Sequence, residues 1–389
     1  MRIKKLLGAG LLATSLLTLA SCGGKGCDLL ILNWGDYLSE DVLKAFQKET
    51  GLKVKEVTAD SNEAFYSKIL NRNAKYDIVV PSDYMIDQMK QDDLIYEIDF
   101  TKLKNYKDNI FVSELNELMN SDDCKDYKNY YVPYFMGSLG IMYSKKNHPE
   151  IENIIKENEW KVLFERDLLP AGTKVGMYNS SRDALAAAEL YYGYSLNSTD
   201  KNEIDECMNL LKKSRFDAWG TDDLKIKISQ HNLDVALVYS GDFFDAFYSD
   251  IEAGAIDNVE QYDIYAPKTH NNVFFDSLVI PKTSSNIDAA YQFIDFMLSD
   301  EALVDIEDND EPVSPSYANA SFVGYCPTIQ AVYDEIFADD EGFGDITSIE
   351  AYDPTRIINA DSSWAEVYRY LGADIYAYIE DKFTEVIVK

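Results

Sequence analysis

The sequence is poor in cysteine and histidine, and neither residue type is spaced as a disulfide framework or a metal site requires. Its 389 residues include five cysteines, with no CxxC pair, and three histidines that lie far apart, His148, His231 and His270. Zinc sites use ligands at close and regular spacing, and disulfide scaffolds use many cysteines in a short chain. We therefore expect no disulfide framework, no bound metal and no cofactor.

Positive charge is also scarce. Lysine and arginine together number 36 against 68 aspartates and glutamates, which gives a formal net charge of −32. A chain this acidic is repelled by nucleic acid phosphates, and the sequence has no basic cluster to offset the repulsion. The balance suits a cationic ligand, although a general acidic excess mainly favours solubility. The composition therefore argues against a nucleic acid partner.

Common catalytic motifs are missing as well. The sequence contains no GxSxG, no HExxH and no P-loop. A pair of carboxylates can still perform acid–base hydrolysis, as in glycosidases, but spacing alone does not assign such a pair. We expect a protein without enzymatic activity, and a carboxylate-based hydrolase is the alternative from another functional class.

The start of the chain carries an export signal. Basic residues precede an apolar run over 6–19, which, allowing for its interrupting threonine and serine residues, is roughly half the ~20 residues that a membrane-spanning helix needs. The run leads into Leu-Ala-Ser-Cys22, which resembles the bacterial lipobox. This resemblance implies that residues 1–21 are a lipoprotein signal peptide and that Cys22 is acylated, with 22–28 as a lipidated tether. The mature chain, with a formal charge of −35, is then expected outside the cytoplasm and anchored to the cell membrane.

The remaining 368 residues are expected to form two α/β units in which short strands alternate with helices. The expected strands are apolar or alternating runs at 29–32, 52–54, 77–81, 174–178, 234–239, 263–265 and 277–281. One helix should begin after Ser39 and end before Gly51, because these residues are typical helix caps. Further helices are expected near 65–70, 183–192, 202–213, 242–251 and 289–298. Parallel sheets of this kind bind ligands at the carboxyl ends of their strands.

Aromatic rings and acidic or hydroxyl groups follow several of these expected strands. They occur together in the segments Asn33–Tyr37, Pro81–Tyr84, Tyr239–Asp242 and Phe274–Ser277. Ring faces attract ammonium groups, and carboxylates provide the charge-assisted hydrogen bonds that a buried cation needs. The pattern predicts a ligand with an apolar stem and cationic ends.

At these residues the chain resembles the bacterial spermidine/putrescine-binding proteins of ABC importers. The resemblance is carried by NWGDYLSEDVLKAFQKETGLKV, SNEAFYSKI, YDIVVPSDYMIDQM, VPYFMGSLGIMYS and FFDSLVIP. It implies a type II periplasmic-binding-protein fold of two lobes, each a mixed, mostly parallel sheet flanked by helices, with the ligand in the cleft between the lobes. The expected lobes are 29–137 with 277–334, and 138–276 with 335–389. The expected partners are a polyamine and the membrane permease with its cytoplasmic ATPase, and the chain is expected to act as a monomer.

The resemblance also implies a set of ligand-binding residues. In it, aromatic rings sandwich the methylene stem, Asp276 holds one ammonium group, and Asp183, Asp242 and Asp36 lie near the other. The full expected set is Trp34, Asp36, Tyr37, Ser82, Tyr84, Asp183, Tyr239, Asp242, Phe274, Asp276 and Tyr325. Tyr239 stands where the family usually has tryptophan.

Several alternatives stay open. Asp183 and Asp242 could simply begin helices, where a carboxylate is stabilised in any case, and Ser82 could be only a helix N-cap. Ser180, where spermidine-preferring members have aspartate, and Asp242, which resembles the acid of putrescine-preferring members, favour putrescine. A ferric-ion receptor of the same fold is a further alternative, suggested by the adjacent tyrosines 130–131 and 191–192.

Overall fold

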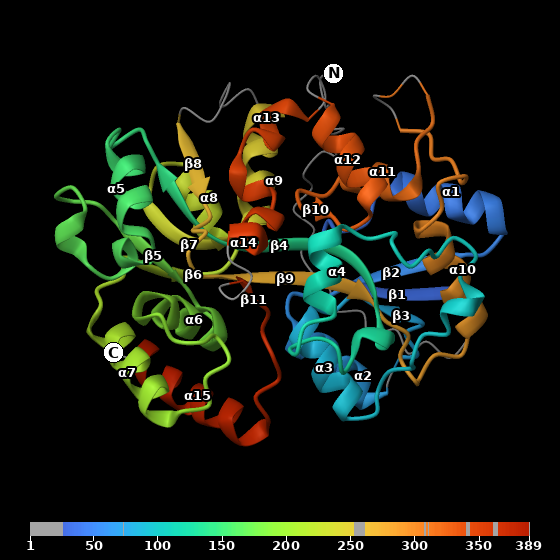
Figure 1. The fold of residues 1–389 in the computed structure, drawn as a ribbon, viewed down its shortest axis with the longest axis horizontal. Helices are drawn as coiled ribbons and strands as arrows, with labels where there is room; N and C mark the ends of the chain where they lie inside the picture. The colour runs from blue at the N-terminus through green and yellow to red at the C-terminus, as the bar shows by residue number, and fades with distance from the viewer. Residues whose placement is uncertain are drawn as a thin grey trace.

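The computed structural model describes residues 26–72, 74–252, 261–306, 309, 311–339, 343–360 and 365–388. The predicted signal peptide, the predicted lipidation residue Cys22 and most of the predicted tether lie outside the described residues. Within them, helices surround one sheet of three strands and one of eight (Figure 1). None of the described helices combines the length and the apolar character that crossing a membrane requires.

The three-stranded sheet is parallel, with the strand order β2-β1-β3. Its strands are β1 (Leu29–Asn33), β2 (Val54–Thr58) and β3 (Ile78–Val79). Apolar runs predicted β1 and β3, whereas the strand expected at 52–54 begins only at Val54. A helix follows each strand in turn: α1 (Glu40–Thr50), α2 (Asn62–Asn71) and α3 (Asp83–Gln91). The loops after β1 and β3 therefore leave the sheet at the same edge, where the candidate residues of both loops can meet.

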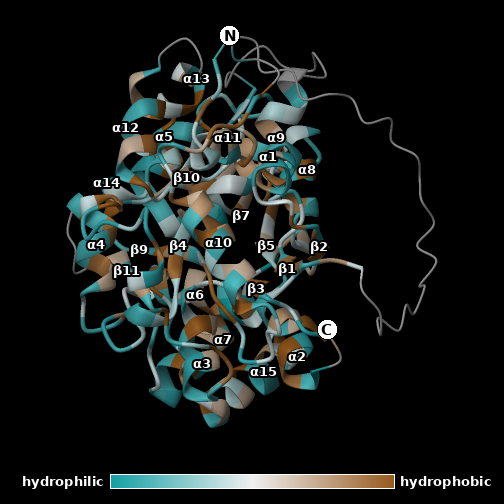
Figure 2. Ribbon diagram, turned by 90° about the vertical axis from the view of Figure 1, so that its right-hand side faces the viewer, coloured by the Kyte–Doolittle hydropathy of each residue, from teal (hydrophilic) through white to brown (hydrophobic). Residues whose placement is uncertain are grey.

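Helix α1 has the predicted caps. The Ser39 side chain accepts a hydrogen bond from the backbone N–H of Asp41, and Gly51 ends the helix with a φ of 74°. Left-handed backbone is open to glycine at little cost, so the chain can turn there into β2. Val42 and Phe46 are the buried residues of this helix. Figure 2 shows the same amphipathic character in the outer helices, whose ribbons alternate between hydrophilic and hydrophobic residues.

The eight-stranded sheet has the order β11-β9-β4-β7-β5-β6, and β8 and β10 also pair with β4. Its strands are β4 (Val132–Ser144), β5 (Val175–Tyr178), β6 (Ala218–Gly220), β7 (Val235–Tyr239), β8 (Tyr262–Tyr265), β9 (Asn271–Leu278), β10 (Cys326–Pro327) and β11 (Ala365–Glu366). Strands β5, β6 and β7 pair in parallel, whereas β4 pairs antiparallel with β7, β8, β9 and β10. The sheet is therefore mixed.

Strands β4 and β9 connect the two halves of the molecule. In Figure 1 they run side by side from the half around β1–β3, called the first lobe below, to the half around β5–β7, called the second lobe. An isolated bridge between Val79 and Val279 joins the continuation of β9 to the three-stranded sheet. Residues 139–143 of β4 pair with β7 in the second lobe. A side chain on β9 can therefore belong to a site that both lobes share.

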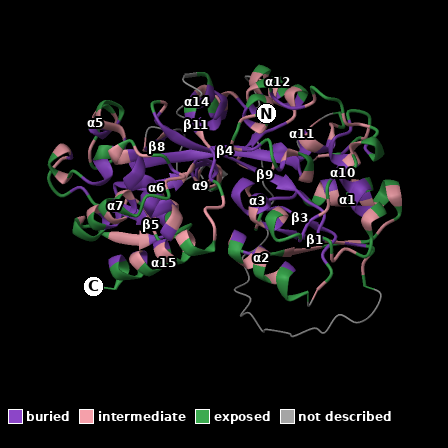
Figure 3. Ribbon diagram, turned by 60° about the horizontal axis from the view of Figure 1, so that its bottom comes forward, coloured by how far each residue is buried: buried purple, intermediate pink, exposed green. Residues whose placement is uncertain are grey.

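Strand β4 was not predicted from the sequence, and β9 lies at a different position from the strand expected there. All residues of β4 are buried, so the strand lacks the alternation of apolar and polar residues that marks a half-exposed strand (Figure 3). Strand β9 was expected at 277–281 but spans Asn271–Leu278. Asn271, Asn272 and Asp276 are all buried there, and these polar residues made the segment look like a loop.

The remaining helices cover the two sheets. In the second lobe these are α5 (Ile151–Asn158), α6 (Ser181–Tyr192), α7 (Lys201–Lys213), α8 (Asp223–Ser229), α9 (Ser240–Glu252) and α15 (Ala373–Ile387). The others are α4 (Ser113–Met119), α10 (Ile287–Met297), α11 (Pro315–Ala320), α12 (Gln330–Ala338), α13 (Gly344–Thr347) and α14 (Thr355–Ala360). Helices α6, α7, α9 and α10 confirm the helices predicted in their segments.

Short 3-10 turns complete the described elements. They are Phe100–Lys102, Lys128–Tyr130, Glu159–Leu163, Arg166–Leu168 and Glu350–Tyr352.

Candidate functional site

Asp276 lies in the middle of β9, and its carboxylate is held by two hydroxyl groups. The phenol of Tyr37 donates to Oδ2 at 2.7 Å, and the Ser82 hydroxyl donates to Oδ1 at 2.6 Å. The residue is only 5% exposed. Burial raises the pKa of Asp276 to about 6, although both hydrogen bonds oppose the rise. Among the residues that the structure describes, no lysine, arginine or histidine forms an ion pair with this carboxylate.

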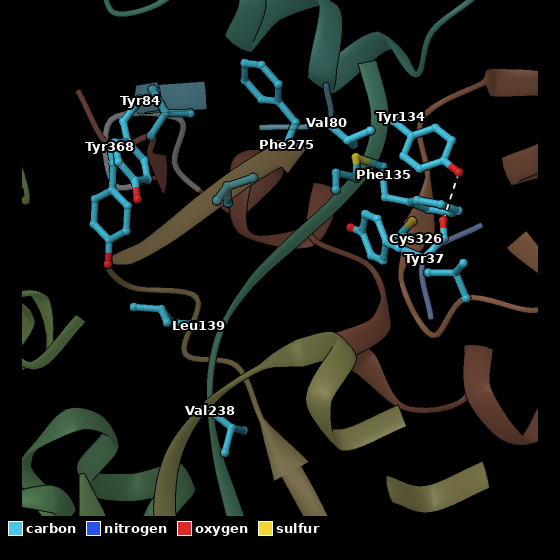
Figure 4. Close-up of a cluster of buried hydrophobic side chains, with 14 of the residues drawn as sticks. Tyr37, Val80, Tyr84, Tyr134, Phe135, Leu139, Val238, Phe275, Cys326 and Tyr368 are labelled. Atoms are coloured by element: carbon cyan, nitrogen blue, oxygen red, sulfur yellow. Dashed lines mark hydrogen bonds between the residues drawn. The ribbon is translucent and has the colours of Figure 1, made fainter. Parts of the chain in front are cut away.

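The two hydroxyl groups are fixed by residues behind them. Tyr134 on β4 donates its phenol hydrogen to the backbone carbonyl of Tyr37 at 2.8 Å, the bond drawn in Figure 4. The Asn62 side chain donates to the Ser82 hydroxyl and accepts from the Ser82 backbone N–H, both at 3.0 Å. Ser82 occupies the N-cap position of α3, yet its side chain makes no capping hydrogen bond. Ser82 is thus directed toward Asp276 and does not act as a side-chain cap.

A second buried acid lies directly beside this group. Asp83 is completely buried, and it accepts hydrogen bonds from the backbone N–H groups of Tyr84 and Phe275. Burial raises the pKa of Asp83 to about 8, and the negative charge of Asp276 adds to the rise. Asp83 is therefore mostly protonated at neutral pH, which limits the negative charge around Asp276 to one carboxylate.

Four aromatic rings form a continuous row from the first lobe to the second. Tyr37 and Tyr325 have ring centroids 5.6 Å apart, Tyr325 and Phe274 5.8 Å, and Phe274 and Tyr239 5.2 Å, all edge to face. Edge-to-face contact at these distances is the favoured geometry for aromatic pairs. Because the rings touch one another, a ligand stem can lie between them only after they separate.

Tyr325 approaches the second lobe closely because residue 241 is glycine. A Cβ atom built on Gly241 would lie 2.0 Å from Cε2 of Tyr325, far inside van der Waals contact. The row of rings therefore depends on a bare backbone at the start of α9.

At the second-lobe end of the row, the carboxylate of Asp183 accepts hydrogen bonds from two phenol hydroxyl groups. The phenol of Tyr239 donates to its Oδ1 at 2.6 Å, and the phenol of Tyr368 donates to the same oxygen at 3.4 Å. Asp183 lies in the first turn of α6, and its backbone N–H donates to the Ser180 hydroxyl. Burial raises the pKa of Asp183, and the Tyr239 hydrogen bond opposes the rise. Asp183 thus lies in the first turn of a helix and also binds Tyr239, the last ring of the row.

Arg182, the residue before Asp183, contacts the first lobe. The centre of its guanidinium lies 3.4 Å from the ring centroid of Tyr84, and the Tyr368 ring stands 5.2 Å away. Figure 4 shows Tyr84 and Tyr368 next to each other, and their centroids are 6.2 Å apart. Glu63 of the first lobe accepts hydrogen bonds from the phenols of Tyr84 and Tyr376. These contacts hold the two lobes together on one side of the row.

Asp242 is also close to the row, but its carboxylate has a cation as partner. Its Oδ2 accepts from the backbone N–H of Tyr239 at 3.3 Å, and its Oδ1 lies 3.4 Å from Lys225 Nζ. Burial raises the pKa of Asp242 to about 6, and Lys225 opposes the rise. Asp242 therefore differs from Asp276 and Asp183, whose carboxylates are held by hydroxyl groups.

Two predicted residues stand apart from this group. Trp34 packs its ring edge to face against Phe65 at 4.6 Å, and Asp36 is exposed with a φ of 51°. Within the described residues, neither makes a hydrogen bond or ring contact with the other predicted site residues. The remaining nine form what is called the interlobe cluster below: Tyr37, Ser82, Tyr84, Asp183, Tyr239, Asp242, Phe274, Asp276 and Tyr325.

Comparisons with known proteins agree with this architecture. A family model described as bacterial extracellular solute-binding protein matches residues 41–321. The chain belongs to the bacterial extracellular solute-binding proteins. It is 30% identical, over 72% of its length and 76% of the relative's, to the putrescine-binding periplasmic protein SpuD of Pseudomonas aeruginosa. It is 29% identical to the spermidine/putrescine-binding periplasmic protein of Escherichia coli, over 76% of this chain and 79% of that one.

Solved structures show the same relationship. The spermidine/putrescine ABC transporter substrate-binding protein PotD of Streptococcus pneumoniae aligns with a TM-score of 0.70 and 28% identity. The alignment covers 92% of this chain and 98% of that one. The predicted two-lobed periplasmic-binding-protein fold is thereby confirmed for this solute-binding protein.

The adjacent tyrosines that suggested iron do not meet in this solute-binding protein. Tyr131 is buried and stacks on Phe275, whereas Tyr191 and Tyr192 end α6. Tyr191 donates its phenol hydrogen to Glu165. Among the described residues, no three histidine, cysteine or acidic side chains are grouped as a metal site requires.

Several residues that the structure places in or around the cluster were not predicted from the sequence. Asp83 follows Ser82 directly and reads as an ordinary first-turn acid of a helix. Tyr368 comes from the chain after β11, and Lys225 comes from a short helix that no pattern predicted. Their partners lie far away in sequence, so only the residues immediately around the family motifs could have been found.

Proposed function

We propose that this solute-binding protein captures a linear polyamine, putrescine or spermidine, between its two lobes. The observation that carries the proposal is the carboxylate of Asp276, which is buried, held by two hydroxyl groups and without a cationic partner among the described residues. A buried charge is costly unless it is paired. A ligand ammonium group would supply the missing opposite charge.

The rings of the cluster suit the rest of such a ligand. Tyr37, Tyr325, Phe274 and Tyr239 could take a methylene stem between them, and burying each CH₂ contributes roughly 0.8 kcal/mol. Asp183 lies at the far end of this row, where its carboxylate would pair with a second ammonium group of the ligand. Tyr84 lies next to Tyr368, whose phenol donates to Asp183 at the end of the row. The names of the relatives, which state putrescine and spermidine, support the same ligand class.

We further propose how the protein is exported, anchored and coupled to transport. Residues 1–21 would direct export and Cys22 would carry the lipid anchor, so that the protein works as a monomer at the outer face of the cell membrane. It would deliver its ligand to the permease of an ABC importer and catalyse no reaction. The proposed lobes are 29–137 with 277–334, and 138–276 with 335–389. Contacts from both lobes to one ligand would favour the closed state.

Calorimetry tests the proposal directly. The purified protein is titrated with putrescine and spermidine, with cadaverine and arginine as comparison ligands. Saturable one-to-one binding of a polyamine is the expected result. A folded, ligand-free protein that binds neither putrescine nor spermidine would contradict the proposal.

A further inference from the structure

A largely buried lysine neutralises one carboxylate of the interlobe cluster. Lys225 reaches from α8 to the start of α9, where its Nζ lies 3.4 Å from Asp242 Oδ1 and 3.0 Å from Asp245 Oδ2. The side chains of Lys225 and Asp242 are 14% and 13% exposed. Solvent and salt screen a pair this far from the surface much less than an exposed pair. The charge of Asp242 is therefore paired from within the protein.

The side chain of Lys225 pairs with acids outside its own helix, unlike that of Lys227 on the same helix. Lys227 pairs with Asp223 at 2.6 Å, four residues away in α8, and the two side chains are 38% and 52% exposed. Such surface pairs within a helix contribute little. The side chain of Lys225 instead extends away from α8 and places its ammonium group beside Asp242 of the cluster.

The three carboxylates of the cluster consequently differ in what they can offer a ligand. Asp276 accepts from the hydroxyls of Tyr37 and Ser82, and Asp183 accepts from two phenols. Hydroxyl donors leave the negative charge in place, whereas Asp242 faces the ammonium group of Lys225, which it shares with the 44% exposed side chain of Asp245. Arg182 directs its guanidinium over the Tyr84 ring, and it forms no ion pair with Asp183 within the described residues.

We propose that Lys225 is a specificity-determining residue that limits to two the ligand ammonium groups this cluster can pair. In this arrangement Asp276 and Asp183 each pair with one ammonium group of a diamine. At Asp242 the ammonium group of Lys225 occupies the place of a third. A triamine would bring its extra positive charge toward Lys225, and like charges at close range repel. The inference rests on the proposed function and narrows its ligand to a diamine.

The test compares putrescine and spermidine on the wild-type chain and on Lys225→Met, which keeps the length of the side chain and removes its charge. We expect the wild type to prefer putrescine. We expect Lys225→Met to raise spermidine affinity at least about tenfold while putrescine affinity changes less than about threefold. Lys225→Arg keeps the charge and should retain the wild-type ratio. Lys227→Met is the matched control on the same helix and should also retain it.

Other outcomes overturn the inference in distinct ways. A wild type that prefers spermidine, or a ratio in Lys225→Met within about threefold of the wild type, contradicts the role of Lys225 while polyamine binding itself stands. Failure of the folded wild type to bind either polyamine overturns the proposed function as well.

A second variant keeps the test decisive if Lys225→Met does not fold. Lys225→Gln also removes the positive charge, and its amide can hydrogen-bond to Asp242 and Asp245. It should raise the affinity for spermidine relative to putrescine at least about tenfold over the wild type. A ratio within about threefold of the wild type would contradict the inference.

Discussion

Tyr37 and Asp276 are 239 positions apart in the sequence, and the phenol of Tyr37 donates a 2.7 Å hydrogen bond to the carboxylate of Asp276. The bond joins the loop after β1, in the first lobe, to β9, a strand that both lobes share. Ser82, from the loop after β3, completes the pair of donors. The carboxylate is therefore positioned by two loops at one edge of the three-stranded sheet and presented by the strand that connects the lobes.

Replacing Asp276 by alanine should abolish most of the affinity for putrescine. A buried ammonium group without its carboxylate loses about 2 to 5 kcal/mol, which corresponds to at least about a thirtyfold rise in Kd. Tyr37→Phe removes only one supporting hydrogen bond and should cost about 0.5 to 1.5 kcal/mol. Calorimetric titration of both variants measures the difference. Equal losses in the two variants would mean that Asp276 does not contact the ligand.

Polyamine affinity should rise with pH because the pKa of Asp276 lies at about 6 in the ligand-free protein. An ammonium group binds the ionised carboxylate, so protonation below pH 6 competes with binding. For one proton the affinity should fall about tenfold for each pH unit well below that pKa. Titrations between pH 4.5 and pH 8 measure this slope. Asp276→Asn should bind weakly and lack the slope, and an unchanged slope in that variant would assign the titration to another group.

Asp83 should make the folded protein less stable as pH rises. Its pKa is about 8 in the folded protein and its ordinary value is 3.8, so between these values the folded state binds the extra proton. Stability from this group is complete below about pH 4 and is lost as pH rises through about 8. Urea unfolding at pH 6 and pH 9 should show a larger decrease for the wild type than for Asp83→Asn. An equal decrease in both proteins would contradict the assignment.

The sequence predicted the parts of the fold that follow local rules. Ser39 and Gly51 capped α1 as expected, and the apolar runs marked the strands β1, β3, β5 and β7. Strand β4 could not be recognised, because burial on both faces removes the alternation that reveals a strand. The polar residues of β9 are satisfied by partners far away in sequence, such as the Asn271 side chain that donates to the carbonyl of Leu139.

The residues of the interlobe cluster were expected from the family resemblance, whereas the electrostatics of their carboxylates were not. The motif residues Tyr37, Ser82 and Asp276 meet as expected, whereas Trp34 and Asp36 make no contact with them. Whether a carboxylate is held by hydroxyl groups or by an ammonium group depends on residues more than fifteen positions away. Sequence spacing cannot show such partners, because they are set by how the elements pack.

Gly241→Ala should destabilise the protein through a clash with Tyr325. Alanine is favoured over glycine inside a helix by about 1 kcal/mol, so the substitution in α9 would otherwise be stabilising. The new Cβ would lie 2.0 Å from the Tyr325 ring and force it away, at a cost of about 1 to 3 kcal/mol. Gly35→Ala is the control, because nothing lies within 4 Å of its Cβ position. Thermal unfolding should show a lower Tm for Gly241→Ala than for Gly35→Ala, and a second substitution, Tyr325→Ala, should remove the difference. Equal Tm values for the two single variants would mean that the ring does not rest on the start of α9 in solution.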